Sequence, residues 1–497
     1  MKKVVCFICL WLSVLSLGCG KKQPPTLHLF FTTDMEGVFW SRPEPHYGNE
    51  VTGGLAVLKS FLDKQTIPFL LLEGGNWFSQ TPEGTLSKGE YFNELSISLP
   101  YSARLFTEKD LMYGWASLQQ IIKKSPAPFV VSNVRLTNGK NPSGLKPWIM
   151  EEIAGVKVGV LGVLNRKASQ GKQRLGGLKI EKEIESVRQT VQTLREKGAD
   201  VVVLLSGLGA SDQKDVLTDI SLAEEIADID VIISANLGRE AAEATRVGKT
   251  WIVYSGSKLD SIGKISLFFN KDNQLTKSEF EDVVLYRRDY GEDELVESLT
   301  QEVRRTTRGQ MNRPVGELME NLNGHLDRES SLGNWAADCL KKWAKTDVAI
   351  INSDSLRDSL SSGTVTQYDL YRLYPYADNI TYLTMKGAAL LNALEEGLEI
   401  EDNFAQVAGL EITYAPNAQK GKRILNVKIN GQPISQQASY RVAVTDHMLA
   451  GGTGHDGFID SLEFKNTQVE MRTVLRLCLA GNKKSIVSKN KRWRIYK

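Results

Sequence analysis

The amino-acid sequence predicts two domains, an α/β domain followed by an α+β domain. The chain has 497 residues, more than the roughly 250 to 300 residues at which one hydrophobic core stops growing. Before residue 290, short apolar runs alternate with stretches of helical periodicity, which is typical of a layered α/β domain. The stretch 294–308 carries both charges and lacks strong helix breakers. We expect it to form the helix between the two domains.

The N-terminal domain is expected to begin with a strand at 27–32, after a polar, proline-containing tether at 20–26. Helices such as 181–197 should separate the later strands. Further buried strands are expected at 69–72, 129–132, 157–161, 201–205 and 231–233. Several of these runs end in small or polar residues, and such loops gather at one edge of an open α/β sheet, where ligands bind. The sequence therefore predicts one crevice at the carboxyl ends of the strands.

The C-terminal domain is expected to begin near Pro314. A helix is predicted at 332–345 and a short strand at 348–351, followed by β-like segments with turn signals at 430–431 and 451–454. This second domain therefore contains both helix and strand.

The overall charge argues against nucleic acid as a partner. Lys and Arg number 61 against 59 Asp and Glu, a formal net charge of +2. A phosphate backbone requires a basic surface, and this balance provides none. Hydrophobic residues at 41% and charged residues at 24% describe ordinary globular material.

The N-terminus has the features of an export signal. Lys2 and Lys3 precede an apolar run at 4–17 that is too short for a membrane span of about 20 residues. The run ends near Cys19 in a segment that resembles the lipobox of bacterial lipoproteins, although Ser16 stands where an aliphatic residue is usual. We expect residues 1–19 to be a lipoprotein signal peptide, with Cys19 acylated and the protein anchored in the periplasm or on the cell surface. A plain secretory signal peptide is the alternative.

After residues 1–19 the chain has two cysteines, Cys339 and Cys478. Two are too few for a disulfide framework, even in an oxidising compartment. Cys339 lies in the predicted helix 332–345, so we expect it to be a small buried hydrophobic residue.

Five segments of the C-terminal half match a known pattern in the same order. Together they resemble the bacterial 5′-nucleotidase family, and the resemblance extends over 27–458. The five segments are 329–338, 347–357, 374–379, 404–409 and 447–454.

The resemblance implies a more detailed architecture than the residues alone predict. Residues 27–290 would form a four-layer α/β/β/α domain of the calcineurin-like metallophosphoesterase type. A linker helix would follow at 291–313, and 314–497 would form an α+β substrate-binding domain of the 5′-nucleotidase C-terminal type.

The first two metal-binding motifs of the family are altered in this chain. The motif D-x-H-G corresponds to 34–37, where Asp34 is kept and Glu36 replaces the histidine. The motif D-x-G-D corresponds to 73–76, where the neutral Asn76 replaces the carboxylate that bridges two metals. A dinuclear site needs such ligands to hold two ions roughly 3.5 to 4 Å apart.

The later motifs have also lost their histidines. In the segment 107–114, Glu108 replaces a metal-binding asparagine and Lys109 stands at the catalytic histidine position. The motif S-H-L-G reads as 206–209 without its histidine, and in G-H-x-H the first histidine position holds Asn236. The resemblance therefore leaves the catalytic residue and the metal ligands of this chain unassigned.

Two interpretations of this crevice remain open. In one, oxygen ligands bind a hard cation such as Mn²⁺, Mg²⁺ or Ca²⁺; the ligands would be Asp34, Glu36, Asn76, Glu108 and Asn236. In the other, which we favour, the Lys109 ammonium fills the former cation site and pairs with Glu36 or Glu108.

Substrate-binding positions of the family are better kept. Arg357 matches an arginine that pairs with substrate, and its rigid guanidinium suits a phosphate. Phe404 matches one of two aromatic residues that sandwich the base, with packing in the core as the alternative role. The second aromatic position holds His447, and the ribose-binding acid is replaced by Thr453. Asn379 lies in the matching turn 374–379.

The sequence predicts an exported, lipid-anchored protein of the 5′-nucleotidase type with impaired catalysis. It would act as a scaffold, or it would bind a nucleotide or another small phosphorylated molecule. No cofactor is assigned to it. The alternative is an active metal-dependent phosphoesterase with a remodelled oxygen-ligand site, in which case a divalent metal is the cofactor.

Overall fold

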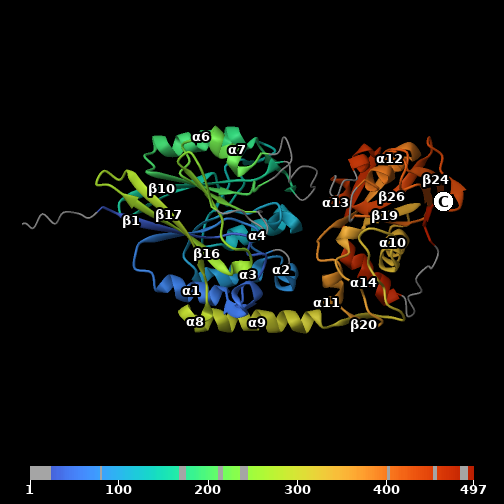
Figure 1. The fold of residues 1–497 in the computed structure, drawn as a ribbon, viewed down its shortest axis with the longest axis horizontal. Helices are drawn as coiled ribbons and strands as arrows, with labels where there is room; N and C mark the ends of the chain where they lie inside the picture. Colours follow the sequence, from blue (N-terminus) through green and yellow to red (C-terminus); the bar gives the residue numbers. More distant parts are fainter. Residues whose placement is uncertain are drawn as a thin grey trace, which may run out of the picture.

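Two domains lie side by side, and the long helix α9 (Glu294–Met311) runs beneath the first towards the second (Figure 1). The computed structural model describes residues 24–78, 81–166, 175–210, 217–235, 244–399, 403–450, 456–481 and 491–496. Helix α9 begins at Asp293, whose Oδ1 accepts a hydrogen bond from the backbone N–H of Val296 at 2.9 Å. Such N-caps satisfy one of the free donors in the first turn of a helix.

Two β-sheets form the centre of the N-terminal domain. The seven-stranded sheet contains, in spatial order, β17 (Leu275–Val284), β16 (Ser261–Phe269), β1 (Thr26–Thr32), β4 (Phe69–Glu73), β5 (Tyr101–Arg104), β6 (Phe129–Val130) and β8 (Leu145–Lys146). The six-stranded sheet contains β14 (Thr245–Val247), β15 (Thr250–Val253), β13 (Val231–Ser234), β12 (Val201–Ser206), β10 (Val156–Val163) and β9 (Trp148–Ile153). Short two-stranded pairs are formed by β2 (Arg42–Glu44) with β3 (Glu50–Thr52) and by β7 (Val134–Leu136) with β11 (Leu178–Ile180).

Helices cover the outer faces of both sheets, as Figure 1 shows. The six-stranded sheet is covered by α6 (Glu183–Glu196) and α7 (Asp219–Glu225). The other side of the domain carries α1 (Leu55–Asp63), α2 (Pro82–Ser87), α3 (Glu90–Leu95), α4 (Trp115–Lys124), α8 (Arg287–Tyr290) and α9. This order confirms the four-layer α/β/β/α fold.

The parallel strands of each sheet end together. Thr32 of β1 pairs with Glu73 of β4, and Glu73 pairs with Arg104 of β5. In the second sheet Val163 pairs with Ser206, and Ser206 pairs with Ser234. The loops that follow these residues therefore start from the same edge, as predicted for a ligand crevice.

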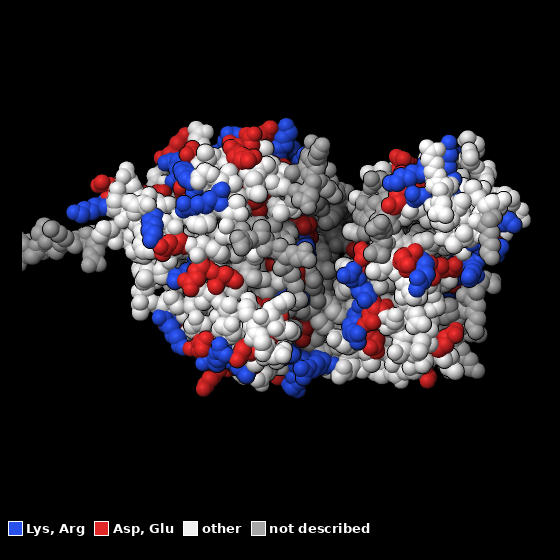
Figure 2. Space-filling model, viewed as in Figure 1, with Lys and Arg blue, Asp and Glu red and all other residues white. Residues whose placement is uncertain are grey.

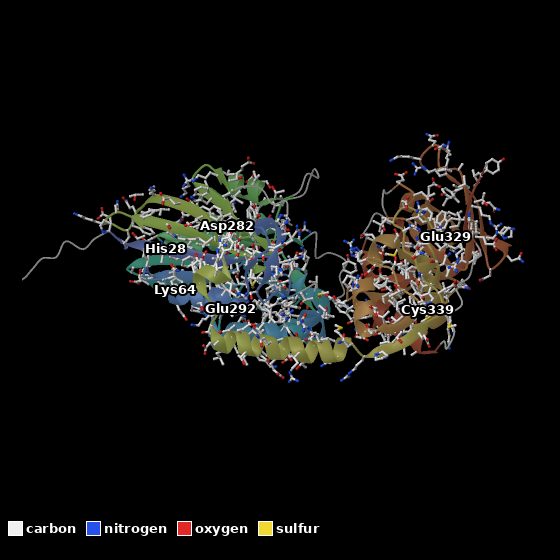
Figure 3. The ribbon with its side chains drawn as sticks, turned by 60° about the horizontal axis from the view of Figure 1, so that its bottom comes forward. His28, Lys64, Asp282, Glu292, Glu329 and Cys339 are labelled. Atoms are coloured by element: carbon white, nitrogen blue, oxygen red, sulfur yellow. A yellow bond between two sulfur atoms is a disulfide. The ribbon has the colours of Figure 1, made fainter. Side chains whose placement is uncertain are left out.

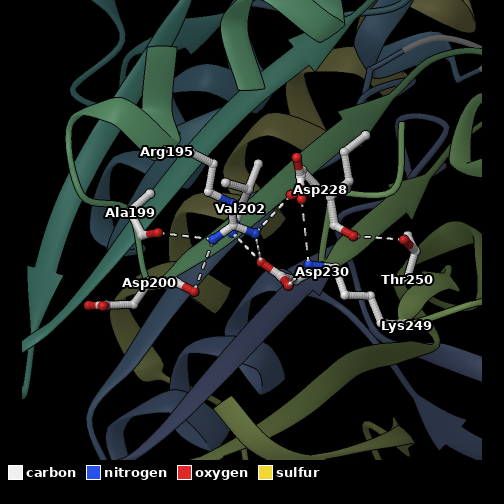
Figure 4. A network of polar contacts seen from close by, with 9 residues as sticks. Arg195, Ala199, Asp200, Val202, Asp228, Asp230, Lys249 and Thr250 are labelled. Atoms are coloured by element: carbon white, nitrogen blue, oxygen red, sulfur yellow. Dashed lines mark hydrogen bonds and ion pairs between the residues drawn. The ribbon is translucent and has the colours of Figure 1, made fainter. Parts of the chain in front are cut away.

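A polar network ties the end of α6 to the strands of the six-stranded sheet (Figure 4). The Arg195 guanidinium pairs with Asp230 at 2.5 Å and donates to the backbone carbonyls of Ala199 and Asp228. Asp230 in turn accepts from the backbone N–H of Val202 at 2.8 Å. These bonds satisfy groups at the starts of β12 and β13, so they fix the end of the sheet away from the crevice.

The C-terminal domain is built on a five-stranded sheet with helices on both faces. Its strands are, in spatial order, β22 (Ala405–Ala408), β19 (Val348–Asn352), β26 (Ser439–Thr445), β21 (Asn379–Lys386) and β27 (Glu463–Glu470). One core lies beneath α10 (Ser331–Ala344), α11 (Gln367–Leu373) and α14 (Met471–Gly481). The other lies beneath α12 (Gly387–Gly397). This arrangement confirms the α+β fold.

Smaller elements complete this domain. They are β18 (Pro314–Leu318), β20 (Gly363–Thr366), β23 (Leu410–Tyr414), β24 (Ile424–Ile429), β25 (Gln432–Pro433), β28 (Trp493–Ile495), α13 (Asp446–Leu449) and the 3₁₀ helix η8 (Asp456–Asp460). The β28 segment is held by Glu329 (labelled in Figure 3), whose carboxylate accepts from the backbone N–H groups of Arg492 and Trp493.

A disulfide joins Cys339 of α10 to Cys478 of α14, with 5.7 Å between the two Cα atoms (Figure 3). The expectation that Cys339 is only a small buried hydrophobic residue is therefore wrong. The two cysteines are 139 residues apart, and only the packing of the two helices on one face of the sheet brings them together.

Acidic and basic side chains are mixed over the face shown in Figure 2, in accordance with the near-neutral net charge. The same view shows a furrow between the two domains. Within the described part of the chain, every helix is too short or too polar to cross a bilayer.

Replacing both cysteines, in the variant Cys339→Ala with Cys478→Ala, should lower the free energy of unfolding by about 2–5 kcal/mol, because a disulfide that closes a long loop restricts the unfolded chain. Urea unfolding followed by circular dichroism measures this change. Reduced wild-type protein should unfold at the midpoint of the variant. Equal midpoints for the oxidised wild type and the variant would show that the disulfide contributes nothing.

Candidate functional site

The loops after β1 and β4 interlock at the crevice. The backbone N–H of Asp34 donates to the Gly75 carbonyl at 3.1 Å, and that of Glu36 donates to the Asn76 carbonyl at 2.9 Å. The Asn76 side-chain amide also donates to Asp34 Oδ1 at 2.6 Å. Three of the five residues at family metal positions are thus brought together, as the resemblance implies.

These three residues have an unusual backbone conformation. Asp34, Glu36 and Asn76 have φ angles of +47°, +53° and +56°, in the left-handed region that residues other than glycine rarely adopt. Each such residue costs free energy and is retained where the surrounding structure determines it, commonly at functional sites. Here the hydrogen bonds between the two loops hold the three residues in this conformation.

Asp110 holds the third segment of the site to the second. Its carboxylate is 1% exposed and accepts from the backbone N–H groups of Asn76 at 2.7 Å, Trp77 at 3.1 Å and Thr107 at 2.9 Å. Burial raises the pKa of Asp110 to about 7, although these hydrogen bonds oppose the shift. The motif comparison assigns this residue no role, and its only signal in the sequence is an acidic residue directly after the motif positions 108 and 109.

Glu73 lies beneath the loops and is fully buried. Its carboxyl accepts from Thr32 Oγ1 at 2.5 Å and from the Gly75 backbone N–H at 3.0 Å. Burial raises the pKa of Glu73 to about 8, against the effects of these hydrogen bonds and of the Arg104 charge. At neutral pH the group is therefore mostly protonated.

The ion pair expected of Lys109 stays a prediction. Among the described residues no ion pair is recorded between its ammonium and Glu36 or Glu108. Lys109 and Glu108 are partly exposed at the start of the short helix η3 (Asp110–Tyr113). Water solvates an ammonium in such a place, and pairing there gains little. Glu36 and Glu108 make other contacts.

A buried carboxylate also joins the two strand ends at which the family places later histidines. Asp219, at the start of α7, accepts hydrogen bonds from Ser206 Oγ at the end of β12 and from Ser234 Oγ at the end of β13. Burial raises the pKa of Asp219 to about 6, although both serines lower it. The position of Asn236 lies outside the described residues.

The described residues do not fit a dinuclear metal centre. A bridging site needs several anionic or imidazole ligands around a common point. Within the described ranges no group of three or more His, Cys, Asp and Glu side chains is placed to hold an ion. Asn76 supplies a donor N–H to Asp34, where a bridging carboxylate would supply only acceptors.

The predicted substrate residues of the C-terminal domain occupy different surroundings. Arg357 is half-exposed and pairs with Asp354 at 2.6 Å. Asn379 and His447 lie close together, because the Asn379 backbone N–H donates to Asp446, the neighbour of exposed His447, at 3.0 Å. Thr453 and the lipidation position Cys19 lie outside the described residues.

Phe404 packs in the core of its domain. It is 9% exposed, and its ring meets Trp493 of β28 edge to face, with 4.8 Å between the ring centroids. This contact favours the packing role that the sequence left open, and it leaves little of the ring accessible to a base.

Asn379 lines a cavity of about 380 Å³ between the two domains. From the N-terminal domain the described wall includes 112–116, the segment just after Lys109. From the C-terminal domain it includes Asn466, Gln468 and Glu470 of β27. The cavity is thus polar on one side, whereas Arg357, Phe404 and His447 are not among the described residues that line it.

Comparison with known proteins agrees with this architecture. Residues 314–460 match the model of the 5′-nucleotidase C-terminal domain. The 5′-nucleotidase of Vibrio cholerae is 22% identical over 507 residues, which cover 92% of this chain and 90% of that protein. Residues 314–460 are therefore a 5′-nucleotidase C-terminal domain, and the chain as a whole is similar to 5′-nucleotidases.

Other relatives cover the chain to different extents. A 5′-nucleotidase-like structure from Staphylococcus aureus, solved with α-ketoglutarate, superposes with a TM-score of 0.79 at 17% identity and covers 95% of this chain and 100% of that chain. The trifunctional nucleotide phosphoesterase YfkN of Bacillus subtilis is 25% identical over 345 residues, 65% of this chain. The match spans only 23% of that longer protein.

The pKa of Glu73 leads to a prediction on stability. Because the carboxyl has a pKa of about 8 in the folded protein against an ordinary value of 4.5, the folded state binds more protons than the unfolded state between these pH values. Stability that is present at low pH is therefore lost as the pH rises through this window. Glu73→Gln should reduce this loss, measured by urea unfolding between pH 5 and pH 9.

The exposed Glu151 provides a matched control. Glu151→Gln should leave the pH dependence of stability as it is in the wild type. A Glu73→Gln variant with the slope of the wild type would show that Glu73 is ionised in the folded protein at neutral pH.

Proposed function

We propose that this protein is an exported, lipid-anchored 5′-nucleotidase-like protein with impaired catalysis, which binds a nucleotide or a similar phosphorylated molecule. The observation that carries the proposal is the chemistry at the crevice. Where the family has a bridging carboxylate, this chain has the Asn76 amide bonded to Asp34. The strand ends that precede the two lost histidine positions, 207 and 236, are joined through Ser206, Ser234 and Asp219.

Impaired catalysis follows from what phosphoester hydrolysis needs. A metallophosphoesterase generates a hydroxide nucleophile and neutralises the phosphoryl oxygens with divalent ions. The buried carboxyls of Asp110 and Glu73 accept hydrogen bonds from the crevice loops, so their oxygens are already engaged. Lys109 at the catalytic position adds a positive charge that repels a cation.

Binding is supported by the other half of the molecule. The names of the relatives include nucleotidases and a nucleotide phosphoesterase, and the matched domain keeps Arg357, whose guanidinium forms a rigid fork for phosphate oxygens. Asn379 offers amide groups beside the interdomain cavity. A phosphate near Arg357 would compete with Asp354 for the guanidinium.

Export and anchoring rest on the N-terminal sequence. The basic residues Lys2 and Lys3, the apolar run 4–17 and Cys19 form the pattern of a lipoprotein signal. Acylation of Cys19 would place the folded domains beside a membrane surface.

The purified mature protein should release no phosphate from AMP above background with Zn²⁺, Mn²⁺, Co²⁺ or Mg²⁺, because the metal ligands are replaced. A colorimetric phosphate assay measures this. Turnover that Asp34→Ala abolishes, while a change of the exposed Asp272 to Ala preserves it, would support the active phosphoesterase with an oxygen-ligand site.

AMP should bind weakly, in the micromolar to millimolar range, which corresponds to about 4–8 kcal/mol. Arg357→Gln should weaken AMP about tenfold or more and leave adenosine unchanged, since the guanidinium contacts only the phosphate. Ligand-observed NMR and calorimetry measure both ligands. Arg494 is another exposed, ion-paired arginine of the same domain. Arg494→Gln should leave the affinities for AMP and for adenosine unchanged. If the wild type binds neither ligand at millimolar concentration, the scaffold role replaces the binding role.

A further inference from the structure

The strand β27 forms one edge of the five-stranded sheet in the C-terminal domain. It pairs with β21 alone within the described chain. The backbone N–H and C=O groups on its other side therefore have no strand partner there. Such an edge is a template for another strand unless charges, bulges or covering elements protect it.

Apolar side chains are exposed beside this edge. Ile459 is 71% exposed, Leu462 is 56% exposed and Phe464 is 55% exposed. Phe464 lies opposite Leu383, which belongs to the core beneath α12, and Ile459 lies on η8, which packs against α12. Both residues thus lie on the α12 side of the sheet edge. Exposed apolar groups that gather in this way commonly mark an interface.

Only the first half of β27 is available for pairing. The pairing of β21 with β27 is irregular between Asn379 and Thr381, and Gln468 has a φ angle of +57°. Irregularities of this kind bend a strand away from its regular path. From Asn466 onward the strand also faces the N-terminal domain, because Asn466, Gln468 and Glu470 line the interdomain cavity. A partner strand would therefore meet the segment 462–465.

We propose that a second copy of this chain pairs with β27 in antiparallel orientation, centred on Phe464. Two-fold symmetry then places Phe464 opposite the partner subunit's Phe464 and Glu463 opposite the partner subunit's Lys465. The two sheets become one continuous sheet, a case of strand addition at an exposed edge.

The charges in this segment are complementary to themselves. Glu463 and Lys465 are both exposed and lie on the same face of the strand, two residues apart. Neither takes part in an ion pair within the described part of the chain. Antiparallel pairing about the residue between them creates two identical ion pairs, and directly opposed pairs stabilise adjacent strands. A second copy satisfies this pattern by symmetry, whereas an unrelated strand would need its own matching charges.

Charge reversal tests the proposal directly. Sedimentation equilibrium of the mature protein should show dimers, and Lys465→Glu should raise the dissociation constant about tenfold or more because four carboxylates then face one another. Glu463→Lys should also raise the dissociation constant about tenfold or more, because four ammonium groups then face one another. An equimolar mixture of the two variants should form heterodimers, and the double variant Glu463→Lys with Lys465→Glu should dimerise as the wild type does.

Lys386→Glu supplies a matched control, because Lys386 is an exposed residue at the end of the neighbouring strand β21. This variant should remain dimeric. A wild type that stays monomeric at high micromolar concentration would overturn the proposal. Dimers that persist unchanged in both single variants would also overturn it, since they would have to use another surface. The nucleotide-binding assay is independent of these outcomes.

Discussion

Backbone hydrogen bonds to buried carboxylates hold the crevice loops of the N-terminal domain in place. Asp110 accepts three of these bonds from two different loops, and a buried N–H without a partner would cost free energy comparable to a lost hydrogen bond. Asp110 holds Asn76 directly. It holds Asp34 indirectly, because the loop after β1 is bonded to the loop after β4 that contains Asn76. Their left-handed conformations are retained for the same reason.

A buried carboxylate also joins polar groups at the other end of the crevice. Asp219 joins the ends of β12 and β13 through Ser206 and Ser234. With Glu73 beneath the first loops, this means that buried acids satisfy the polar groups at the carboxyl ends of both sheets. These hydrogen bonds hold the strand ends and the crevice loops together through groups of the chain itself.

In the C-terminal domain, a strand from a distant part of the chain packs against Phe404, which the resemblance places at a base-stacking position. Trp493 of β28 packs against Phe404 and donates from its Nε1 to the Ala405 carbonyl at 3.0 Å. Phe404 is therefore part of a core, whereas Arg357 and His447 remain accessible. Recognition of a ligand would rest on polar groups more than on stacking.

The sequence by itself determined the two domains, several buried strands of the first domain and the polar loops at their ends, because hydrophobic periodicity and turn residues act locally. It also showed that Glu36, Asn76 and Lys109 stand at altered motif positions. Only the tertiary structure decided that Cys339 bonds to Cys478, that Asp110 caps the loops and that Phe404 packs against Trp493. These outcomes depend on distances between residues far apart in the chain and on burial, which changes the energy of a charge and cannot be obtained from the local pattern.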